Sequence, residues 1–355
     1  MKNPMCDTAC LFFGTTSGST GLTYSLCKEL NASGKLKKIF LSNRNDIKKH
    51  FDKEFESKIV YFDPANSIKR FFNIFNLIYI YFSILKSIYK FKLKKLLISM
   101  HHPWSIILII FLWPFIRISS VIHDSKPHDG DNKLLTNFTN FLICIFSNKI
   151  IFLSKIQMSI LAKTAFTGII LKYRDVSYVK HPSFFHYKSD SFNNDYVNYK
   201  YDFVFLGRLE PYKGLDMLLK AFKIFKKKFK KNSSLLIAGK PSKNFEINNF
   251  KYDGIEVLAK YICDDNIPKI INSGSVVVIP YLEATQSGLV LLANDFRKTC
   301  VITPCVGLIE QVNYCGQHIM SKDFTSESFA NAMNESLDIK LKNFKNIYSD
   351  IQNHV

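Results

Sequence analysis

The sequence has no pair of cysteines at the Cys-x-x-Cys spacing, although it contains eight cysteines. They stand at positions 6, 10, 27, 144, 263, 300, 305 and 315. The missing pairs argue against zinc-ribbon and thioredoxin-like chemistry, and the histidines offer no zinc-ligand spacing either. We therefore predict reduced thiols in a cytoplasmic protein and no metal site.

Long apolar runs are also missing. The most apolar stretch, residues 105–116, is far shorter than the roughly 20 residues that span a bilayer, so a buried core helix is the favoured interpretation. The first residues are polar and no secretory signal is expected. No internal repeat is visible.

Acidic residues are scarce beside basic ones, 29 against 48, and the formal net charge is +19. This charge predicts an anionic partner: nucleotide phosphates, nucleic acid or an acidic membrane surface. Nucleic acid is the least favoured of these and we expect none as a partner. No nucleic-acid-binding module is recognisable, and the aromatic residues follow core periodicity instead of forming a stacking platform.

The most informative stretch is 203–216. Its apolar start, 203–206, predicts a buried strand that ends at Gly207. Arg208 and Lys213 follow in a loop, and an amphipathic helix begins directly after it. Two cations at the exit of a strand, beside a helix N-terminus, suit a diphosphate. The alternative is an ordinary turn with two solvated cations.

The helix predicted over 215–231 has one apolar face and one lysine-rich face. The lysines are Lys220, Lys223, Lys226, Lys227, Lys228, Lys230 and Lys231. Two interpretations remain open: a solvated face, or a surface that docks on anionic lipid head groups.

Strands and helices alternate in the first half of the chain. Strands are predicted over 9–13, 38–42, 60–62, 96–100, 118–122 and 149–153. A loop rich in glycine and serine, 14–21, is expected after the first strand, although it is neither a Walker loop nor a clean Gly-x-Gly-x-x-Gly motif. Polar residues follow later strands, among them His101 and His123 with Asp124. Open α/β sheets bind ligands at these strand ends.

The alternation starts again after residue 200, with strands predicted over 203–206, 234–238, 255–258, 276–279 and 300–303. We expect an α/β fold of two Rossmann-like, doubly wound domains that face one another across a cleft. The expected parts are an N-terminal Rossmann-like domain (1–185), a linker (186–200), a C-terminal Rossmann-like domain (201–335) and a C-terminal helix (336–355) that could cross back to the first domain.

The second half resembles glycosyltransferase family four, the retaining transferases of the GT-B fold. The segments that carry the resemblance stand in the family's order: 207–214, 237–241, 261–262, 280–290 and 307–310. In the first half, residues 17–21, 101–103 and 123–124 look similar to landmarks of the family's acceptor domain.

The resemblance implies catalytic roles for three residues. Arg208 and Lys213 would neutralise the donor diphosphate and stabilise it as a leaving group, and His123 would meet the donor sugar. The donor-binding residues implied are Gly18, Gly207, Arg208, Lys213, Gly239, Lys240, Ile262, Thr285, Ser287, Gly288, Leu289 and Glu310. The backbone amides of Ser287, Gly288 and Leu289 would cradle the phosphates.

His101, Asp124 and His128 are candidates for the acceptor side. For His123 a second interpretation stays open, a core histidine bonded to a backbone carbonyl. The resemblance also implies a nucleoside diphosphate sugar as donor and no required cofactor. The acceptor would be a saccharide or a polyprenyl-linked saccharide in O-antigen, capsule or other surface-polysaccharide assembly. Peripheral contact with the inner face of the cell membrane would fit the basic charge.

The sequence departs from the family at a Glu-x7-Glu pair, where Thr285 and Ala293 stand instead. Glu283 and Asp295 lie two residues away, and two residues along a helix turn a side chain by about 200°, so neither is a simple substitute. The alternative function is therefore a non-catalytic GT-B-fold protein that binds sugar or lipid in an assembly complex.

Overall fold

The computed structural model describes residues 6–14, 17–64, 73–123, 125, 133–182, 199–242, 246 and 250–337. The chain divides after Pro182 into two compact units, called unit 1 and unit 2 below, and each is described by itself. The linker predicted over 186–200 and the helix predicted over 336–355 lie almost entirely outside the described residues.

Unit 1 is a parallel seven-stranded sheet with the order β3-β2-β1-β4-β5-β6-β7. Its strands are β1 (Thr8–Phe12), β2 (Leu36–Ser42), β3 (Ile59–Phe62), β4 (Lys95–Met100), β5 (Arg117–Ile122), β6 (Lys149–Phe152) and β7 (Asp175–Tyr178). Its α-helices are α1 (Ser17–Ala32), α2 (Asn45–Phe55), α4 (Ile74–Phe91), α5 (Pro103–Leu112), α6 (Lys133–Phe146), α7 (Lys155–Ala162) and α8 (Ala165–Leu171).

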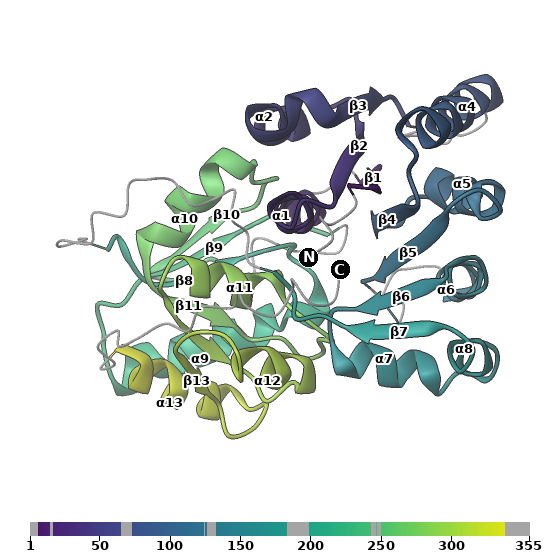
Figure 1. Cartoon of the computed structure of the whole chain (residues 1–355). Coiled ribbons are helices and arrows are strands. Elements are labelled where there is room, and N and C mark those ends of the chain that lie inside the picture. The colour runs from purple at the N-terminus through teal and green to yellow at the C-terminus, as the bar shows by residue number, and fades with distance from the viewer. Residues whose placement is uncertain are drawn as a thin grey trace. The chain divides into compact units, whose positions relative to one another are not determined.

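Four of these helices form one layer on the sheet. Figure 1 shows α4, α5, α6 and α8 side by side along one side of unit 1. In α4, Ile80, Ile84 and Ile88 recur every four residues and enter the core, while Asn73 caps the first turn by accepting from the N–H of Asn76 at 3.1 Å. By length and composition alone α4 is apolar enough to cross a membrane, but this isoleucine face packs on the sheet.

The glycine- and serine-rich segment after β1 is helical sooner than predicted. Helix α1 begins at Ser17, so the loop expected through residue 21 is wrong and Gly18 lies in the first turn of the helix. The helix is held by polar contacts that a propensity argument does not see. The buried hydroxyl of Thr23 lies 2.7 Å from that of Ser99 on β4 and donates to the Ser19 carbonyl at 2.8 Å.

Unit 2 is a parallel six-stranded sheet with the order β10-β9-β8-β11-β12-β13. Its strands are β8 (Tyr201–Leu206), β9 (Leu235–Ala238), β10 (Ile255–Leu258), β11 (Gly274–Ile279), β12 (Thr299–Ile302) and β13 (His318–Met320). Its α-helices are α9 (Leu215–Lys228), α10 (Ile267–Ser273), α11 (Gly288–Asp295), α12 (Val306–Val312) and α13 (Ser326–Leu337). In each sheet the first strand of the unit is central. The next two strands in the sequence are added on one side of it, and the remaining strands are added on the other side. This is the doubly wound Rossmann order.

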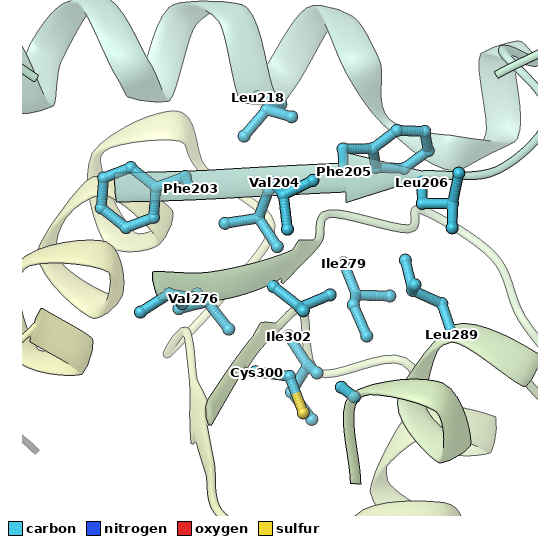
Figure 2. Packing of buried hydrophobic residues seen from close by; sticks show 14 of the residues in the cluster. Phe203, Val204, Phe205, Leu206, Leu218, Val276, Ile279, Leu289, Cys300 and Ile302 are labelled. Carbon is cyan, nitrogen blue, oxygen red and sulfur yellow. The ribbon is translucent and has the colours of Figure 1, made fainter. Parts of the chain in front are cut away.

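The core of unit 2 is built around β8, whose apolar run is buried as predicted. Val204 and the Leu218 side chain of α9 lie on opposite faces of this strand (Figure 2). On the α9 face, the rings of Phe203 and Phe225 meet edge to face, with centroids 5.1 Å apart. A strand covered on both faces explains the continuous apolar run without polar alternation.

The lysine-rich face of α9 is partly used inside unit 2. Lys226 is buried and its Nζ lies 2.6 Å from a carboxylate oxygen of Asp253. Lys228 pairs with Glu327 of α13 at 2.5 Å, and Lys230 pairs with Asp202 at 2.7 Å. Neither interpretation of this face therefore applies to all of its lysines.

All eight cysteines are free thiols. Cys6 in unit 1 and Cys263 in unit 2 are exposed, and the other six are buried.

Candidate functional site

The polar residues predicted from the sequence gather at the carboxyl ends of the strands of unit 2. Strands β8 and β11 are neighbours at the point where the strand order reverses. The loop after β8 contains the short 3₁₀ turn η3 (Pro211–Lys213) and ends at Gly214. It is tied to the loop after β11 by the N–H of Leu282, which donates to the Tyr212 carbonyl at 2.9 Å. Such a switch point is where open α/β sheets bind ligands.

Gly214 allows the two loops to meet. It has a φ of +69°, in the left-handed region, and a Cβ there would lie 1.8 Å from the carbonyl oxygen of Pro280. Any side chain would force the loops apart, so glycine is required at this point.

Arg208 and Lys213 converge on two tyrosines. The Arg208 guanidinium donates to the hydroxyl of Tyr212 at 3.1 Å, and Lys213 Nζ lies 4.9 Å from the centre of the same ring. Lys213 Nζ also lies 3.7 Å from the centre of the Tyr281 ring. The aromatic faces hold the ammonium group by cation–π attraction, so the structure brings both predicted cations together beside Tyr212 and Tyr281.

Tyr281 is the buried aromatic residue on which Lys213 lies. The side chain is buried, and burial raises the pKa of its hydroxyl to about 12, while Ser287 and the positive charge of Arg208 oppose the rise. The hydroxyl lies 3.4 Å from Oγ of Ser287. Tyr281 therefore stays neutral at physiological pH and connects the loop after β8 to the start of α11.

The start of α11 is held by two side chains. Oγ of Ser287 caps the helix by accepting from the N–H of Leu289 at 3.2 Å. The amide of Gln311 bridges both backbone groups of Ser287: its oxygen accepts from the Ser287 N–H, and its NH₂ donates to the Ser287 carbonyl at 3.2 Å. Of the three amides predicted to cradle phosphates, those of Ser287 and Leu289 are thus already engaged. The N–H of exposed Gly288 makes no hydrogen bond within the described part of the chain.

The two positions that lack glutamate differ in their surroundings. Thr285 is half-buried in the loop before α11. Gly307 of α12 packs so closely on the backbone of Thr285 that a Cβ added to Gly307 would lie 2.4 Å from the Thr285 carbonyl carbon. Ala293 is fully buried in the core of unit 2. A carboxylate in place of Ala293 would be removed from water, so a small apolar residue suits this core.

The remaining residues predicted for the donor also follow strands of unit 2. Gly207 follows β8, and Gly239 with exposed Lys240 follows β9. The two loops pair where the N–H of Leu209 donates to the Lys240 carbonyl at 2.9 Å. Buried Ile262 follows β10.

Glu310 lies half-buried on α12, the helix after β12, directly before Gln311.

In unit 1, His123 sits at the end of β5 beside two other histidines. Its Nε2 donates to the carbonyl of Ser99 at 3.1 Å, as the core-histidine interpretation predicts. Its ring lies 6.5 Å from that of His181. Burial, reinforced by His123, lowers the pKa of His101 to about 3. His101 and His123 both line a mainly apolar cavity of about 440 Å³ between α5 and α6.

Asp124 and His128 lie outside the described residues. Within the described ranges no group of three or more His, Cys, Asp or Glu residues is placed to hold a metal ion. Sequence reasoning missed Tyr212, Tyr281 and Gln311 as site residues. The two tyrosines lie within or next to the motifs, which was a usable signal, whereas nothing in the sequence distinguished Gln311.

Residues 200–338 match the family described as Glycosyl transferases group 1. No curated protein matches the chain. Several solved structures share its fold. Anabaena HepE in complex with UDP and glucose is 12% identical, with a TM-score of 0.64 over 94% of this chain and 90% of that one.

Sucrose-phosphate synthase from Thermosynechococcus elongatus is also 12% identical, with a TM-score of 0.66 over 93% and 90% of the two chains. A glycosyltransferase from Rickettsia africae is 15% identical, with a TM-score of 0.61 over 94% and 88%. These similarities confirm the predicted two-domain α/β fold of the GT-B type.

Proposed function

We propose that this chain is a glycosyltransferase that takes its sugar from a nucleoside diphosphate sugar. The observation that carries the proposal is the convergence of Arg208 and Lys213 on Tyr212 and Tyr281 at the switch point of unit 2. The match of this unit to the Glycosyl transferases group 1 family supports it, as does the fold shared with HepE, which was solved with UDP-glucose.

In the proposed reaction the bond between the sugar's anomeric carbon and the diphosphate breaks, and negative charge grows on the diphosphate. Arg208 and Lys213 offset this charge, which lowers the barrier because the donors are held in position before the reaction. The N–H of Gly288 adds a neutral donor at the start of α11. In this mechanism the two side-chain cations do the work of a divalent metal, so no metal is required.

We also infer the finer features from the family resemblance. The transfer would retain the anomeric configuration, and the acceptor would be a saccharide or a polyprenyl-linked saccharide of a surface polysaccharide. His123, the residue that would meet the donor sugar, and His101, the acceptor-side candidate in the described part of unit 1, both line the cavity between α5 and α6. The enzyme would work in the cytoplasm at the inner face of the cell membrane.

The test is release of nucleoside diphosphate from a panel of UDP- and GDP-sugars. The double variant Arg208→Ala/Lys213→Ala should lose activity by at least about a hundredfold, a typical loss for removing transition-state charge stabilisation. Lys220→Ala, an exposed lysine on α9, is the matched control and should keep full activity. Full activity in the double variant would refute the roles given to the two cations.

The second candidate is a non-catalytic GT-B protein that binds sugar or lipid. Thr285 and buried Ala293, where the family has glutamates, favour it. Thermal-shift measurements separate the two candidates: stabilisation by UDP- or GDP-sugars supports the transferase, and no response to any nucleotide favours the binding protein.

A further inference from the structure

The helix layer of unit 1 exposes an unusual number of large apolar side chains. Each of its four helices contributes at least one that is more than half exposed, among them Phe75 on α4 (85%), Phe111 on α5 (59%), Leu134 on α6 (82%) and Phe166 on α8 (75%). Single exposed apolar residues are normal, but a patch that extends over several helices marks an interaction surface.

Ring contacts show that these helices form one continuous surface, here called the aromatic face. Tyr81 of α4 meets Phe111 of α5 with centroids 6.2 Å apart. Trp113, directly after α5, meets Phe146 of α6 at 6.2 Å. Phe141 of α6 meets Phe166 of α8 at 6.3 Å. The exposed rings therefore lie on adjacent helices, in the order shown in Figure 1.

The outer side of α4 has the composition of a helix at a membrane interface. Its exposed residues at one end are apolar or aromatic, including Phe75, Tyr79 and Phe82. At the other end Lys86 and Lys90 are exposed beside Tyr89. Aromatic side chains of such a surface can enter the head-group region, while lysines near its end extend their ammonium groups toward lipid phosphates.

A basic cavity adjoins the aromatic face. It has a volume of about 660 Å³, and its lining includes Lys94, Lys95, Trp113, Phe115 and Arg117. Lys95 and Arg117 are register partners at the starts of β4 and β5, so two like charges stand side by side on neighbouring strands. Asp7 also lines this cavity, but Lys94, Lys95 and Arg117 outnumber its single carboxylate, and the excess positive charge favours an anion there. Because Trp113 belongs to both surfaces, an anion bound here would lie at the edge of the aromatic face.

We propose that the aromatic face docks unit 1 on an anionic lipid bilayer, with lipid phosphates at Lys95 and Arg117. A second copy of the chain fits this surface less well. A twofold contact through the same face would join two surfaces of the same positive charge, supplied by Lys86, Lys90 and the basic cavity, and like charges would oppose the contact. Anionic lipids instead supply the apolar layer and the negative charge together. The proposal does not depend on glycosyl transfer.

This surface differs from the lysine face of α9, on which the sequence suggested lipid docking. Three lysines of the α9 segment form ion pairs with carboxylates of unit 2. The exposed apolar residues of the aromatic face all belong to unit 1, far from α9 in the sequence. The two surfaces can therefore be tested against one another with matched sets of variants.

The experiment is sedimentation of the purified full chain with vesicles of phosphatidylcholine, with and without phosphatidylglycerol. The unsubstituted protein should bind the anionic vesicles. Phe75→Ser/Phe82→Ser should weaken this binding by about tenfold or more, because two exposed rings no longer enter the interface. Lys95→Ala/Arg117→Ala should remove only the preference for phosphatidylglycerol, about a tenfold effect. Lys220→Ala/Lys223→Ala/Lys227→Ala, on the exposed side of α9, is the control and should bind normally.

A second measurement needs no substitution in the face. The chain has two tryptophans, of which Trp104 is buried and Trp113 is 44% exposed. Brominated lipids should quench part of the fluorescence, the part that comes from Trp113. The proposal is overturned if the unsubstituted protein binds neither kind of vesicle, or if Lys220→Ala/Lys223→Ala/Lys227→Ala is the only variant that loses binding. It is also overturned if the vesicle-bound protein shows no quenching of its tryptophan fluorescence. A lipid-free dimer that Phe75→Ser/Phe82→Ser breaks would also overturn it and assign the face to a second copy.

Discussion

Gly239 packs directly on the backbone of Gly207, and a Cβ added to Gly239 would lie 1.6 Å from the Gly207 carbonyl oxygen. The contact brings the loop after β9 against the loop that carries Arg208. Both glycines have a φ of +156°, so a side chain at either one strains the backbone, but only Gly239 has a backbone atom in the way.

Gly239→Ala should destabilise unit 2 by about 2–4 kcal/mol, because backbone has to move to admit the methyl group. Gly207→Ala is the matched comparison. Its Cβ would make only an ordinary contact, 3.7 Å from the ring of Phe205, and the expected loss is about 1–2 kcal/mol of backbone strain. Denaturant unfolding measures both variants, and equal losses would contradict the close packing.

Gln311→Leu should lower the free energy of unfolding by about 2–3 kcal/mol. The substitution removes both bonds to Ser287 and leaves the buried Ser287 N–H without an acceptor. Asn313→Ala, at an exposed position just beyond the same helix, should change stability by less than about 0.5 kcal/mol. If Gln311→Leu is as stable as the control, the amide bridge does not hold the start of α11.

Lys298 should make stability rise at alkaline pH. Its side chain is buried, donates to the Gly274 carbonyl at 2.8 Å and lies over the ring of Tyr199, and burial lowers its pKa from 10.5 to about 8. Between these two values the unfolded chain still holds a proton that the native chain has released. Stability therefore rises with pH across this window, by up to about 3 kcal/mol.

Lys298→Met should remove this rise, which unfolding curves recorded from pH 8 to about 10.5 would measure. Lys227→Met, at an exposed position on α9, should follow the unsubstituted protein. Identical pH profiles for the protein and Lys298→Met would show that the native amine is not desolvated.

His181 should make unit 1 sensitive to acid. The ring is buried, its Nδ1 lies 2.9 Å from the Pro182 carbonyl oxygen, and burial, opposed by that bond and assisted by His123, lowers its pKa from 6.5 to about 4. Stability from this group is complete above pH 6.5 and falls as the unfolded chain takes up a proton below it. The expected slope is about 1.4 kcal/mol per pH unit until about pH 4.

His181→Gln should make the acid loss of stability shallower by this one-proton slope, as measured by thermal unfolding between pH 6.5 and about 4. His101, whose pKa is also lowered, continues to contribute. His50→Gln on α2 is the control. An unchanged slope in His181→Gln would contradict the buried neutral state of His181.

Most of the fold followed from the sequence because strands buried on both faces are continuous apolar runs, as 203–206 and 276–279 illustrate. Helix α2 was missed, although Ile47, Phe51 and Phe55 recur at helical spacing and are buried, because they are embedded in a charged segment. The short edge strands β7 and β13 carry too few apolar residues to give a pattern.

The site was partly predictable. Arg208 and Lys213 could be found because their positions relative to a strand end and a helix start are local properties of the sequence. Gln311 could not, because its partner Ser287 lies 24 residues away and meets it only in the folded sheet. Gly18 was misplaced for the same reason, since the contact between Thr23 and Ser99 that supports an earlier start of α1 is long-range.

The distribution of the thiols has a practical consequence. Since Cys6 and Cys263 are the exposed cysteines, one in each unit, the unsubstituted chain already presents one accessible attachment point per unit for maleimide dyes. A donor–acceptor dye pair on these two sulfur atoms would report the separation of the units in solution by energy transfer, and how it changes when a sugar nucleotide or a vesicle is added.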